Sequence, residues 1–348
     1  MTTPIITTVG LDIAKHVIQV HAVDTRGKPV IRKALKRHQV LPFFANLPLC
    51  LIGIEACSGA HDWARRLTVL GHTVKLMAPQ FVKPYVKANK HDAADAEAIC
   101  EAVSRPSVCV VSIEAPEQQA LLALHRARQG FVTARTAQAN QIRGLLAGFG
   151  LVVPKGLATL KQRLPEILED AENDLPGAFR ELLHTLGAHL AELNRQVDDL
   201  TQRIEAVHGA NPVSRRLAQI PGIGPLIATA LLASIGDIRG FANGRQLAAW
   251  LGLVPKQSST GGKTRLLGIS KRGDTYLRTL LIHGARSALR TAQRRADVNA
   301  AWLTRLADRR QPNIAAVALA HKNVRIAFAL LAHDQDYRPS DVPQAATA

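Results

Sequence analysis

The most informative stretch of this chain reads Asn89-Lys90-His91-Asp92-Ala93-Ala94-Asp95-Ala96-Glu97-Ala98-Ile99-Cys100. Its alanines and its spaced apolar residues predict a helix. Residues three positions apart share a helix face, so the side chains of Asp92 and Asp95 should point the same way. Two neighbouring carboxylates repel each other in an apolar setting, so this pair must be either solvated or held by a cation.

Two earlier acidic residues are candidates to join this pair. Asp12 ends the apolar run Val9-Gly10-Leu11, and Glu55 ends the run Leu51-Ile52-Gly53-Ile54. Runs rich in β-branched residues predict strands. A helix is also expected at 60–70, and Gly71 would end it. The expected strands cover residues 5–12, 17–23, 30–34, 49–54 and 74–77, with a possible helix before the fourth strand and a helix at 60–70 before the fifth.

The resulting order of three strands, helix, strand, helix, strand and helix is that of the RNase H-like nuclease fold. In that fold, acids from the first strand, the fourth strand and a late helix meet at one end of the sheet. Oxygen ligands suit Mg²⁺ or Mn²⁺ better than zinc, and two such ions about 4 Å apart clamp a phosphodiester. One such acid alone is usually a cap or an ion-pair partner. Together, the acids predict a metal site formed by Asp12, Glu55, Asp92 and Asp95.

Length and charge define the rest of the expectation. A chain of 348 residues predicts two or three domains. We expect an α/β domain at 1–115, long helices with a coiled coil at 116–210, a mostly α-helical domain at 211–333 and a loose tail at 334–348. The net charge of +17 indicates a polyanionic partner, first of all nucleic acid. Residues 239–325 hold 17 Lys and Arg against three acids, a surplus of 14, which favours a contact surface over an ordinary solvated one.

Four cysteines are present, Cys50, Cys57, Cys100 and Cys109, without a C-x-x-C pair or zinc-like histidine spacing. They predict reduced, mostly buried thiols. The N-terminus has no basic region followed by an apolar segment, and no run of about 18 apolar residues is found. We therefore expect a soluble, cytoplasmic protein without a membrane partner, associated with the nucleoid.

Two long helices are expected in the middle of the chain. The first, at 117–148, carries a polar face with several arginines that either follows a nucleic-acid backbone or faces solvent. The second has apolar residues alternately three and four apart, which is the pattern of a coiled-coil seam. This seam predicts pairing with another helix from a second copy of the chain, or packing within its own domain. Its members are Leu183, Leu186, Leu190, Leu193, Val197, Leu200, Ile204 and Val207.

The turn Ile220-Pro221-Gly222-Ile223-Gly224-Pro225 precedes an apolar helix at 226–235. Backbone N–H groups in such a turn bind phosphate in helix-hairpin-helix DNA-binding proteins. The motif is short, and an ordinary turn at a helix start is an equal alternative. If the first interpretation holds, Gly222 and Gly224 contact nucleic acid.

A polar segment at 256–265, expected to be a loop, follows a helix at 241–253. Its glycines and hydroxyls allow close approach to a phosphate, and one hydroxyl could act as a nucleophile if Lys263, Arg265 or a metal activated it. A basic helix expected at 274–295 extends the positive surface, and a last helix is expected at 314–331. The predicted nucleic-acid contacts of this region are Lys256, Lys263, Arg265, Lys271, Arg272 and Arg278.

With these motifs in place, the chain resembles the DEDD-type insertion-sequence transposases, a group that includes the Piv-like DNA invertases and the bridge-RNA-guided recombinases. The resemblance extends over nearly the whole chain. It rests on Gly10-Leu11-Asp12, Gly53-Ile54-Glu55-Ala56, the run from Met77-Ala78-Pro79-Gln80 through Asp92 to Ala98, Ile220-Pro221-Gly222-Ile223-Gly224, Ser259-Thr260-Gly261-Gly262-Lys263, and Gly268-Ile269-Ser270-Lys271-Arg272-Gly273-Asp274.

The resemblance implies a RuvC-like domain whose four acids, here Asp12, Glu55, Asp92 and Asp95, bind Mg²⁺ or Mn²⁺. It also implies a serine nucleophile in the C-terminal transposase domain that forms a phosphoserine link to DNA, in a composite site across subunits of a dimer or tetramer. Ser259 matches best, while Ser258 is a weaker match and Thr260 departs from the pattern. A second strand's hydroxyl would later displace the serine. The family further implies donor and target DNA and a noncoding guide RNA as partners.

Three other functions remain open from the sequence. A Holliday-junction-type endonuclease would use water as the nucleophile and Ser259 only to hold phosphate. An actin-like ATPase would use Val9-Gly10-Leu11-Asp12-Ile13-Ala14-Lys15 as its first phosphate loop, but a second such loop is not evident. A non-catalytic nucleic-acid-binding protein would need none of the four acids.

Overall fold

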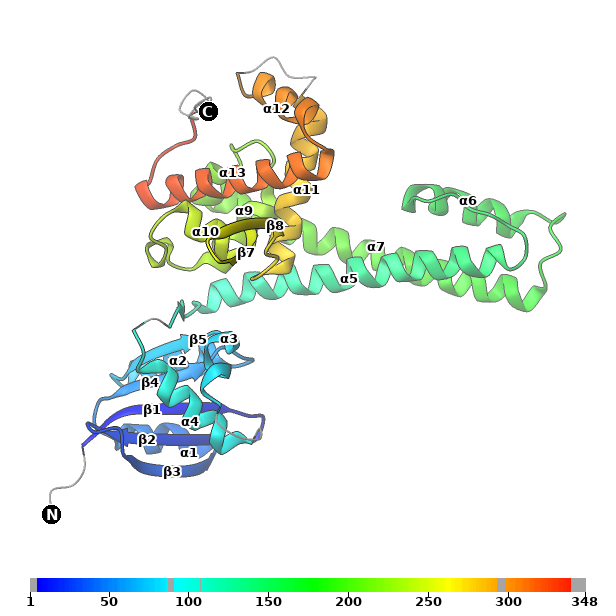
Figure 1. The fold of residues 1–348 in the computed structure, drawn as a ribbon. Helices are drawn as coiled ribbons and strands as arrows, with labels where there is room; N and C mark the ends of the chain where they lie inside the picture. The colour runs from blue at the N-terminus through cyan, green and yellow to red at the C-terminus, as the bar shows by residue number, and fades with distance from the viewer. Residues whose placement is uncertain (1–4, 87–90, 107, 293–297, 339–348) are drawn as a thin grey trace. The chain divides into compact units, whose positions relative to one another are not determined.

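This computed structural model describes residues 5–86, 91–106, 108–292 and 298–338, so Asn89 and Lys90 of the opening stretch lie outside the described residues. The chain is organised in two units, Met1–Pro116 and Glu117–Ala348. The first is built on a β-sheet and the second on helices (Figure 1). The predicted succession of three strands, helix, strand, helix, strand and helix is confirmed in the first unit.

The strands of the first unit form a mixed sheet in the order β3-β2-β1-β4-β5-β6 within the described part of the chain. β1 pairs antiparallel with β2 and parallel with β4, so the first and fourth strands end at the same edge. The elements are β1 (Ile6–Ile13), β2 (Val17–Asp24), β3 (Pro29–Lys36), α1 (Arg37–Ala45), β4 (Leu51–Glu55), α2 (Ala60–Val69), β5 (Thr73–Met77), α3 (Pro79–Val82), the 3₁₀ turn η1 (Lys83–Tyr85), α4 (Asp92–Val103) and β6 (Val110–Val111).

Helix α4 lies unusually close to the sheet because two strand positions carry no side chain. A Cβ added to Gly10 would lie 2.1 Å from the Ala96 carbonyl oxygen, and one added to Gly53 would lie 2.7 Å from the Val103 Cβ. Only glycine permits this approach. The other face of the sheet packs against α1 and α2, whose Phe44 and Trp63 are buried in the same core as the strands.

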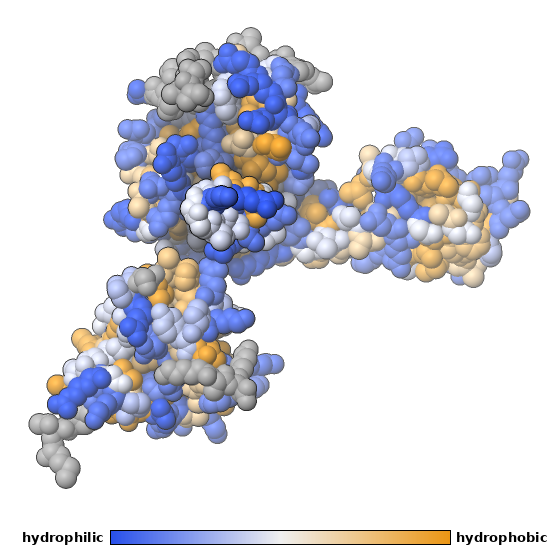
Figure 2. Space-filling model, viewed as in Figure 1, coloured by the Kyte–Doolittle hydropathy of each residue, from blue (hydrophilic) through white to orange (hydrophobic). Residues whose placement is uncertain are grey.

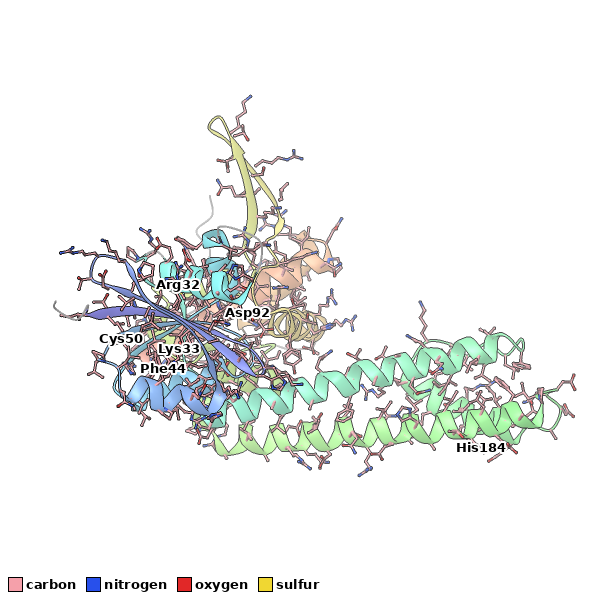
Figure 3. The ribbon with its side chains drawn as sticks, turned by 90° about the horizontal axis from the view of Figure 1, so that it is seen from below. Arg32, Lys33, Phe44, Cys50, Asp92 and His184 are labelled. Carbon is pink, nitrogen blue, oxygen red and sulfur yellow. The ribbon has the colours of Figure 1, made fainter. Side chains whose placement is uncertain are left out.

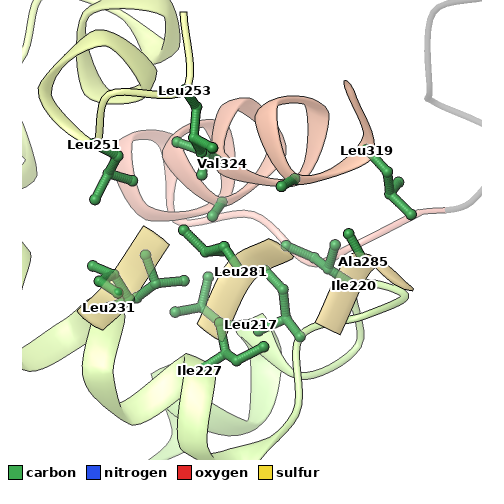
Figure 4. Packing of buried hydrophobic residues seen from close by; sticks show 14 of the residues in the cluster. Leu217, Ile220, Ile227, Leu231, Leu251, Leu253, Leu281, Ala285, Leu319 and Val324 are labelled. Atoms are coloured by element: carbon green, nitrogen blue, oxygen red, sulfur yellow. The ribbon is translucent and has the colours of Figure 1, made fainter. Parts of the chain in front are cut away.

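The second unit consists of helices and one β-hairpin. Its main core joins α8, α9, α10, α11 and α13, with Leu217, Leu231, Leu281 and Val324 among its fully buried residues (Figure 4). The elements are α5 (Pro116–Ala147), α6 (Leu157–Glu169), α7 (Gly177–Ala210), α8 (Pro212–Leu217), α9 (Pro225–Ile235), the 3₁₀ turn η2 (Ile238–Gly240), α10 (Gly244–Trp250), β7 (Pro255–Thr260), β8 (Lys263–Ile269), α11 (Thr275–Ala292), α12 (Val298–Arg309) and α13 (Pro312–His333).

The predicted coiled-coil seam belongs to α7, and its partner lies in the same chain. Helices α5 and α7 run side by side (Figure 1), and α6 covers their far end. Leu183 and Ile204 of the seam are fully buried in this monomer, so the prediction that the seam pairs with a second copy is wrong. Three side-chain hydrogen bonds show the antiparallel order, joining Arg128 to Thr201, Arg135 to Asn194, and His189 to Gln138.

The arginines predicted to form a nucleic-acid face on α5 are partly used inside the chain. Arg128 and Arg135 bond α7, and Arg143 donates to the Gly156 carbonyl. Between α6 and α7 the surface carries hydrophobic patches among polar residues (Figure 2). The antiparallel pair of α5 and α7 therefore uses these arginines to hold the second unit together.

One helix of the described residues, α13, is long and apolar enough to cross a membrane by length and composition. Its apolar side chains, Ala316, Ala320, Val324 and Ala327 among them, are buried in the main core of the second unit. Helix α13 is therefore a core helix in this fold. Residues 339–348 of the predicted tail lie outside the described part.

A buried histidine joins three helices of the second unit. His125 of α5 is fully buried, with Nδ1 2.9 Å from the Tyr276 hydroxyl and Nε2 3.0 Å from Thr229 Oγ1. Thr229 donates its own proton to the Pro225 carbonyl, so Nε2–H donates to Thr229 and the Tyr276 hydroxyl donates to Nδ1. Burial, and then the charge of Arg128, lower the pKa of His125 to about 4.

This shift predicts a loss of stability in mild acid. Between its ordinary pKa of 6.5 and about 4, the imidazole takes up a proton when unfolded but not when folded, so the free energy of unfolding falls as pH falls through this window. We expect a loss approaching about 3 kcal/mol at its lower end. Urea unfolding at several pH values, compared with His125→Gln, measures it. The difference between the two proteins should shrink as pH falls, and a constant difference would contradict the prediction.

Candidate metal centre and nucleic-acid interface

Carboxylates from β1 and from the first turn of α4 meet at one end of the sheet. One oxygen from each of Asp12, Asp92 and Asp95 lies within 4.8 Å of the other two. Asp12 and Asp95 are half-buried, whereas Asp92 is exposed. The prediction that Asp92 and Asp95 share a helix face is confirmed. Within the described residues, this is the single group of His, Cys, Asp or Glu side chains with such geometry.

Strand register explains why the acids converge. Gly10 of β1 lies opposite Gly53 of β4, and both lie beneath α4. Side chains two residues apart on a strand face the same way. Asp12 and Glu55 follow these glycines by two residues, so both leave the sheet on the face that carries α4. The two glycines therefore bring the helix acids down to the strand acids.

Glu55 stands slightly apart from the other three predicted acids. It is the last residue of β4 and half-buried, but it does not belong to the group within 4.8 Å. Partial desolvation, followed by the charges of Asp12 and Glu55, raises the pKa of the Cys57 thiol, which places both acids near that residue. Cys57 and Cys109 are exposed, so the prediction of mostly buried thiols holds only for Cys50 and Cys100.

The donor set fits a hard divalent cation. All three clustered ligands are carboxylate oxygens, which suit Mg²⁺ or Mn²⁺. Asp92 and Asp95 lie in the first turn of α4, where the helix dipole favours negative charge. His91 caps this turn, since its Nδ1 accepts a hydrogen bond from the Ala94 N–H at 3.2 Å. The cap fixes the start of the helix that carries both acids.

The segment predicted as a phosphate-binding loop is instead a β-hairpin. Strands β7 and β8 pair antiparallel, and Gly261 and Gly262 form the turn with φ of +55° and +75°. Such a pair of positive angles suits a two-residue hairpin turn. All residues from Pro255 to Gly268 are exposed, and the hairpin projects from its helical unit with its side chains in solvent (Figure 3).

Pairing within the hairpin sorts the hydroxyls onto two faces. Ser258 lies opposite Arg265 and Thr260 opposite Lys263, while Ser259 lies opposite Thr264. Directly opposed residues share a face and successive residues alternate. Ser258 and Thr260 therefore share the basic face, and Ser259 lies on the other one. The expectation that Lys263 or Arg265 activates Ser259 is not met by this register.

Ser259 has a different neighbour. Gln257, two residues earlier on the same face, donates from Nε2 to Ser259 Oγ at 2.8 Å. The serine therefore accepts from Gln257 and keeps its own proton available for an outside acceptor. Gln257 was not predicted as a site residue from the sequence. Its position two residues before Ser259 would have placed both side chains on one face if this segment had been predicted as a strand.

The predicted contacts Lys271 and Arg272 lie just after the hairpin in a tightly held segment. Both side chains are exposed, and Lys271 adopts a left-handed backbone with φ of +55°. Its N–H bonds the Gly252 carbonyl. A Cβ on Gly252 would lie 2.2 Å from the Arg272 carbonyl oxygen. The segment therefore rests against the end of α10 and presents two cations outward.

Arg278 has another role than the one predicted. Its side chain is only 7% exposed, and its guanidinium donates to the carbonyls of Leu251 at 3.1 Å and Arg272 at 2.7 Å and to Thr275 Oγ1. The prediction of a nucleic-acid contact is therefore wrong for Arg278. This residue holds together the two chain segments from which the hairpin arises.

We expect Arg278→Gln to lower the free energy of unfolding by about 3 kcal/mol, because the buried Leu251 carbonyl and the partly buried Arg272 carbonyl lose a charged donor. Urea unfolding followed by intrinsic fluorescence measures the loss, in a protein where Trp63 and Trp302 are replaced by Phe so that the signal comes from Trp250, the neighbour of Leu251. Arg265→Gln, on the exposed hairpin, serves as the control and should leave stability unchanged. If Arg278 bound phosphate instead, its variant would keep full stability and weaken the salt dependence of DNA binding.

In the predicted phosphate-binding turn, Gly222 is required for close packing against α11. Gly222 has φ of +91°, and a Cβ there would lie 2.8 Å from the Gly284 carbonyl oxygen of α11. Asn323 of α13 donates to the Pro221 carbonyl at 2.8 Å. Gly224 is the N-cap residue that precedes α9, and no side chain caps the first turn of this helix. Packing alone thus explains Gly222, while a phosphate contact at Gly224 stays a prediction.

Comparison with known proteins identifies the family. A DEDD-type IS110 transposase profile matches residues 9–150, and that of the transposase IS116/IS110/IS902 family matches residues 214–299. A probable family 20 transposase of Pseudomonas aeruginosa is 52% identical over 332 residues, which cover 95% of this chain and 98% of that protein. The transposase for insertion sequence element IS1111A of Coxiella burnetii is 43% identical, over 94% of this chain and 90% of its own.

A third relative, the transposase for insertion sequence element IS1328 of Yersinia enterocolitica, is 40% identical over 93% of this chain and 96% of that protein. The first profile spans the acid cluster and the second spans the hairpin. Membership in a DEDD transposase family implies dependence on a divalent metal and DNA as the substrate. The chain belongs to the IS116/IS110/IS902 family of insertion-sequence transposases, and it is a DNA transposase.

Proposed function

We propose that this transposase cuts and rejoins DNA through a covalent bond to Ser259, with Mg²⁺ or Mn²⁺ held by Asp12, Asp92 and Asp95 and supported by Glu55. The observation that carries the proposal is the cluster of three carboxylates at the start of α4. The mixed sheet and its element order support a RuvC-like character for the first unit.

The acids and the hairpin have separate tasks. The carboxylates hold and orient the cation, which when bound polarises a phosphate and offsets the charge that develops during displacement. The hairpin offers Ser259 on an exposed strand, where the serine can reach a DNA backbone without displacing protein. Lys256, Lys263, Arg265, Lys271 and Arg272 are exposed and would bind flanking phosphates.

Strand transfer through Ser259 conserves the number of phosphodiester bonds. The Ser259 oxygen forms a bond to phosphorus and the bond from phosphorus to the leaving deoxyribose oxygen breaks. The serine proton passes to a base or to solvent, and the leaving oxygen takes up a proton from the same source and departs as a hydroxyl. A hydroxyl from a second strand end then attacks the phosphoserine and releases Ser259. Because each step exchanges one phosphoester for another, no ATP is needed to reseal the DNA.

We also propose an element-encoded noncoding guide RNA and a homo-oligomer, dimer or tetramer, which the resemblance to the bridge-RNA-guided recombinases implies. The net charge of +17, with a surplus of 14 between residues 239 and 325, supports two polyanionic partners. Sequencing the RNA that co-purifies from cells carrying the element tests the guide. A discrete RNA from the flank of the element is expected, and random cellular RNA would contradict it.

Trapping the reaction tests the chemistry. Wild-type protein, element-end DNA and Mg²⁺ are mixed, denatured and separated, and a covalent protein–DNA adduct is expected that a chelator prevents. The adduct is then digested with a protease and analysed by mass spectrometry. The nucleotide is expected on the peptide that contains Ser259. Cut DNA without any adduct would replace the proposal by a water-dependent endonuclease of the Holliday-junction type.

A further inference from the structure

A cavity of about 380 Å³ opens between α4 and the β2–β3 edge of the sheet. Its floor and walls come from both strands, from η1 and from the first half of α4. This volume lies in the range of pockets that bind small organic groups. The lining side chains that matter below are Gln19, His21, Arg32, Tyr85, His91 and Glu97.

The cavity adjoins the acid cluster. Gln19 pairs with Asp12 across β1 and β2, and His21 pairs with Gly10. Paired residues share a face, so both side chains lie on the α4 side of the sheet with Asp12. On the opposite wall, His91 immediately precedes Asp92. The lining residues Gln19 and His91 are thus direct neighbours of Asp12 and Asp92. A DNA strand bound at the carboxylates therefore lies next to this cavity.

The cavity combines a guanidinium with an aromatic ring. Arg32 pairs with His21 on the α4 face, and its NH2 lies 3.6 Å from a Glu97 carboxylate oxygen. The Arg32 side chain is still 64% exposed, so other N–H groups are available for a phosphate. The half-buried Tyr85 offers a ring against which a base or sugar can pack. His21 is 96% buried and adds a polar surface at the floor.

The neighbouring Lys33 points elsewhere. Its ammonium lies 5.6 Å from the centroid of the Phe43 ring of α1, on the far face of the sheet. In Figure 3 the label of Arg32 lies nearer α4, which begins at Asp92, and that of Lys33 lies beside Phe44. Lys33 also borders the cavity, but its ammonium lies over Phe43. Of these two adjacent cations of β3, Arg32 is therefore the one whose charged group is directed to the α4 face.

We propose that this cavity binds one nucleotide of the DNA strand that crosses the acid cluster, with Arg32 on its phosphate and Tyr85 against its base. Glu97 orients the free guanidinium and gives way to the phosphate. Stacking on a single ring does not distinguish bases, so the site positions the strand without reading its sequence. This inference rests on the proposed function, since the strand at the acids is taken to be DNA.

Photocrosslinking of the full-length chain tests the site without requiring any cleavage. A short single-stranded DNA with one central thiothymidine is irradiated with the protein in Ca²⁺, and labelled peptides are identified by mass spectrometry. Label is expected on the peptide containing Tyr85. Arg32→Ala should reduce this label roughly fivefold or more, whereas Lys33→Ala, which removes the same charge from the next residue, should leave it unchanged.

Three outcomes overturn the proposal. These are absence of label on the Tyr85 peptide, equal label in Arg32→Ala and Lys33→Ala, and label at this peptide from an RNA oligonucleotide but not from DNA. Failure here is separable from failure of the serine mechanism. A protein that forms no serine adduct can still label Tyr85, and a protein that forms the adduct without labelling Tyr85 refutes only the cavity.

Discussion

Asp95→Asn is expected to lower strand transfer on the order of a thousandfold while leaving the fold intact. The change removes one negative charge from a cluster in which three carboxylate oxygens lie within 4.8 Å of one another. Asparagine has nearly the same shape and still offers one oxygen, but it attracts a divalent cation far less strongly. Transfer of element-end DNA, measured with purified protein across a range of Mn²⁺ concentrations, gives the loss.

The control for this prediction is Asp62→Asn, which removes an equal charge from the exposed surface of α2. It should transfer strands at the wild-type rate. Direct titration with Mn²⁺ provides a second readout, because Asp95→Asn should weaken binding while Asp62→Asn should not. Full activity of Asp95→Asn, with unchanged Mn²⁺ binding, would show that strand transfer does not depend on a cation held by Asp95.

Glu55 lies outside the group of three, and a graded effect follows from that position. If Glu55 only supports the ion bound by its neighbours, Glu55→Gln should cost less activity than Asp95→Asn. An equal loss would show that the carboxylates rearrange on metal binding so that all four become ligands. The two variants together therefore distinguish a fixed cluster from one that closes around its cation.

Much of the first unit could be predicted from sequence because its signals are local. Helical spacing alone placed Asp92 and Asp95 on one face, and the strand runs placed Asp12 and Glu55 at strand ends. The role of Gly10 could not be predicted in this way. Its need for glycine comes from the Ala96 carbonyl, more than 80 residues later, which no local pattern records.

The errors in the second unit share one physical cause. A heptad seam shows that a helix needs a partner but not which one, so α5 of the same chain took the place of a second copy. In the sequence, Arg278 cannot be distinguished from the other cations of a basic region. Its role depends on the carbonyls of Leu251 and Arg272, to which it donates hydrogen bonds in the folded chain. Periodicity encodes which face is buried, whereas the identity of the contact depends on distant backbone.

The hairpin shows the same limit at the site itself. Glycines and hydroxyls in one segment suggested a loop, since such residues are frequent in turns. Only Gly261 and Gly262 form the turn, and the hydroxyls lie on strands. That difference matters because a strand alternates its side chains, and a loop does not. The register therefore separates two adjacent serines that the sequence left equivalent.

Ser259→Ala is expected to abolish the covalent protein–DNA adduct and to reduce strand transfer by at least about 10⁴-fold, because the proposed nucleophile is absent. Ser258→Ala should keep the adduct. Ser258 lies on the basic face opposite Arg265, so its loss removes at most a phosphate contact, whereas Ser259 lies on the other face beside Gln257. The measurement is the yield of adduct after denaturation, with each variant tested on the same element-end DNA.

The two serines are matched controls for each other, since both are exposed, both lie on β7 and both lose one hydroxyl. Binding of DNA should stay close to wild type in Ser259→Ala, which separates loss of chemistry from loss of contact. An adduct that persists in Ser259→Ala and disappears in Ser258→Ala would move the nucleophile to the basic face. It would then restore Arg265 as the group that activates it, because in this hairpin the nucleophile and its activator must leave the sheet on the same side.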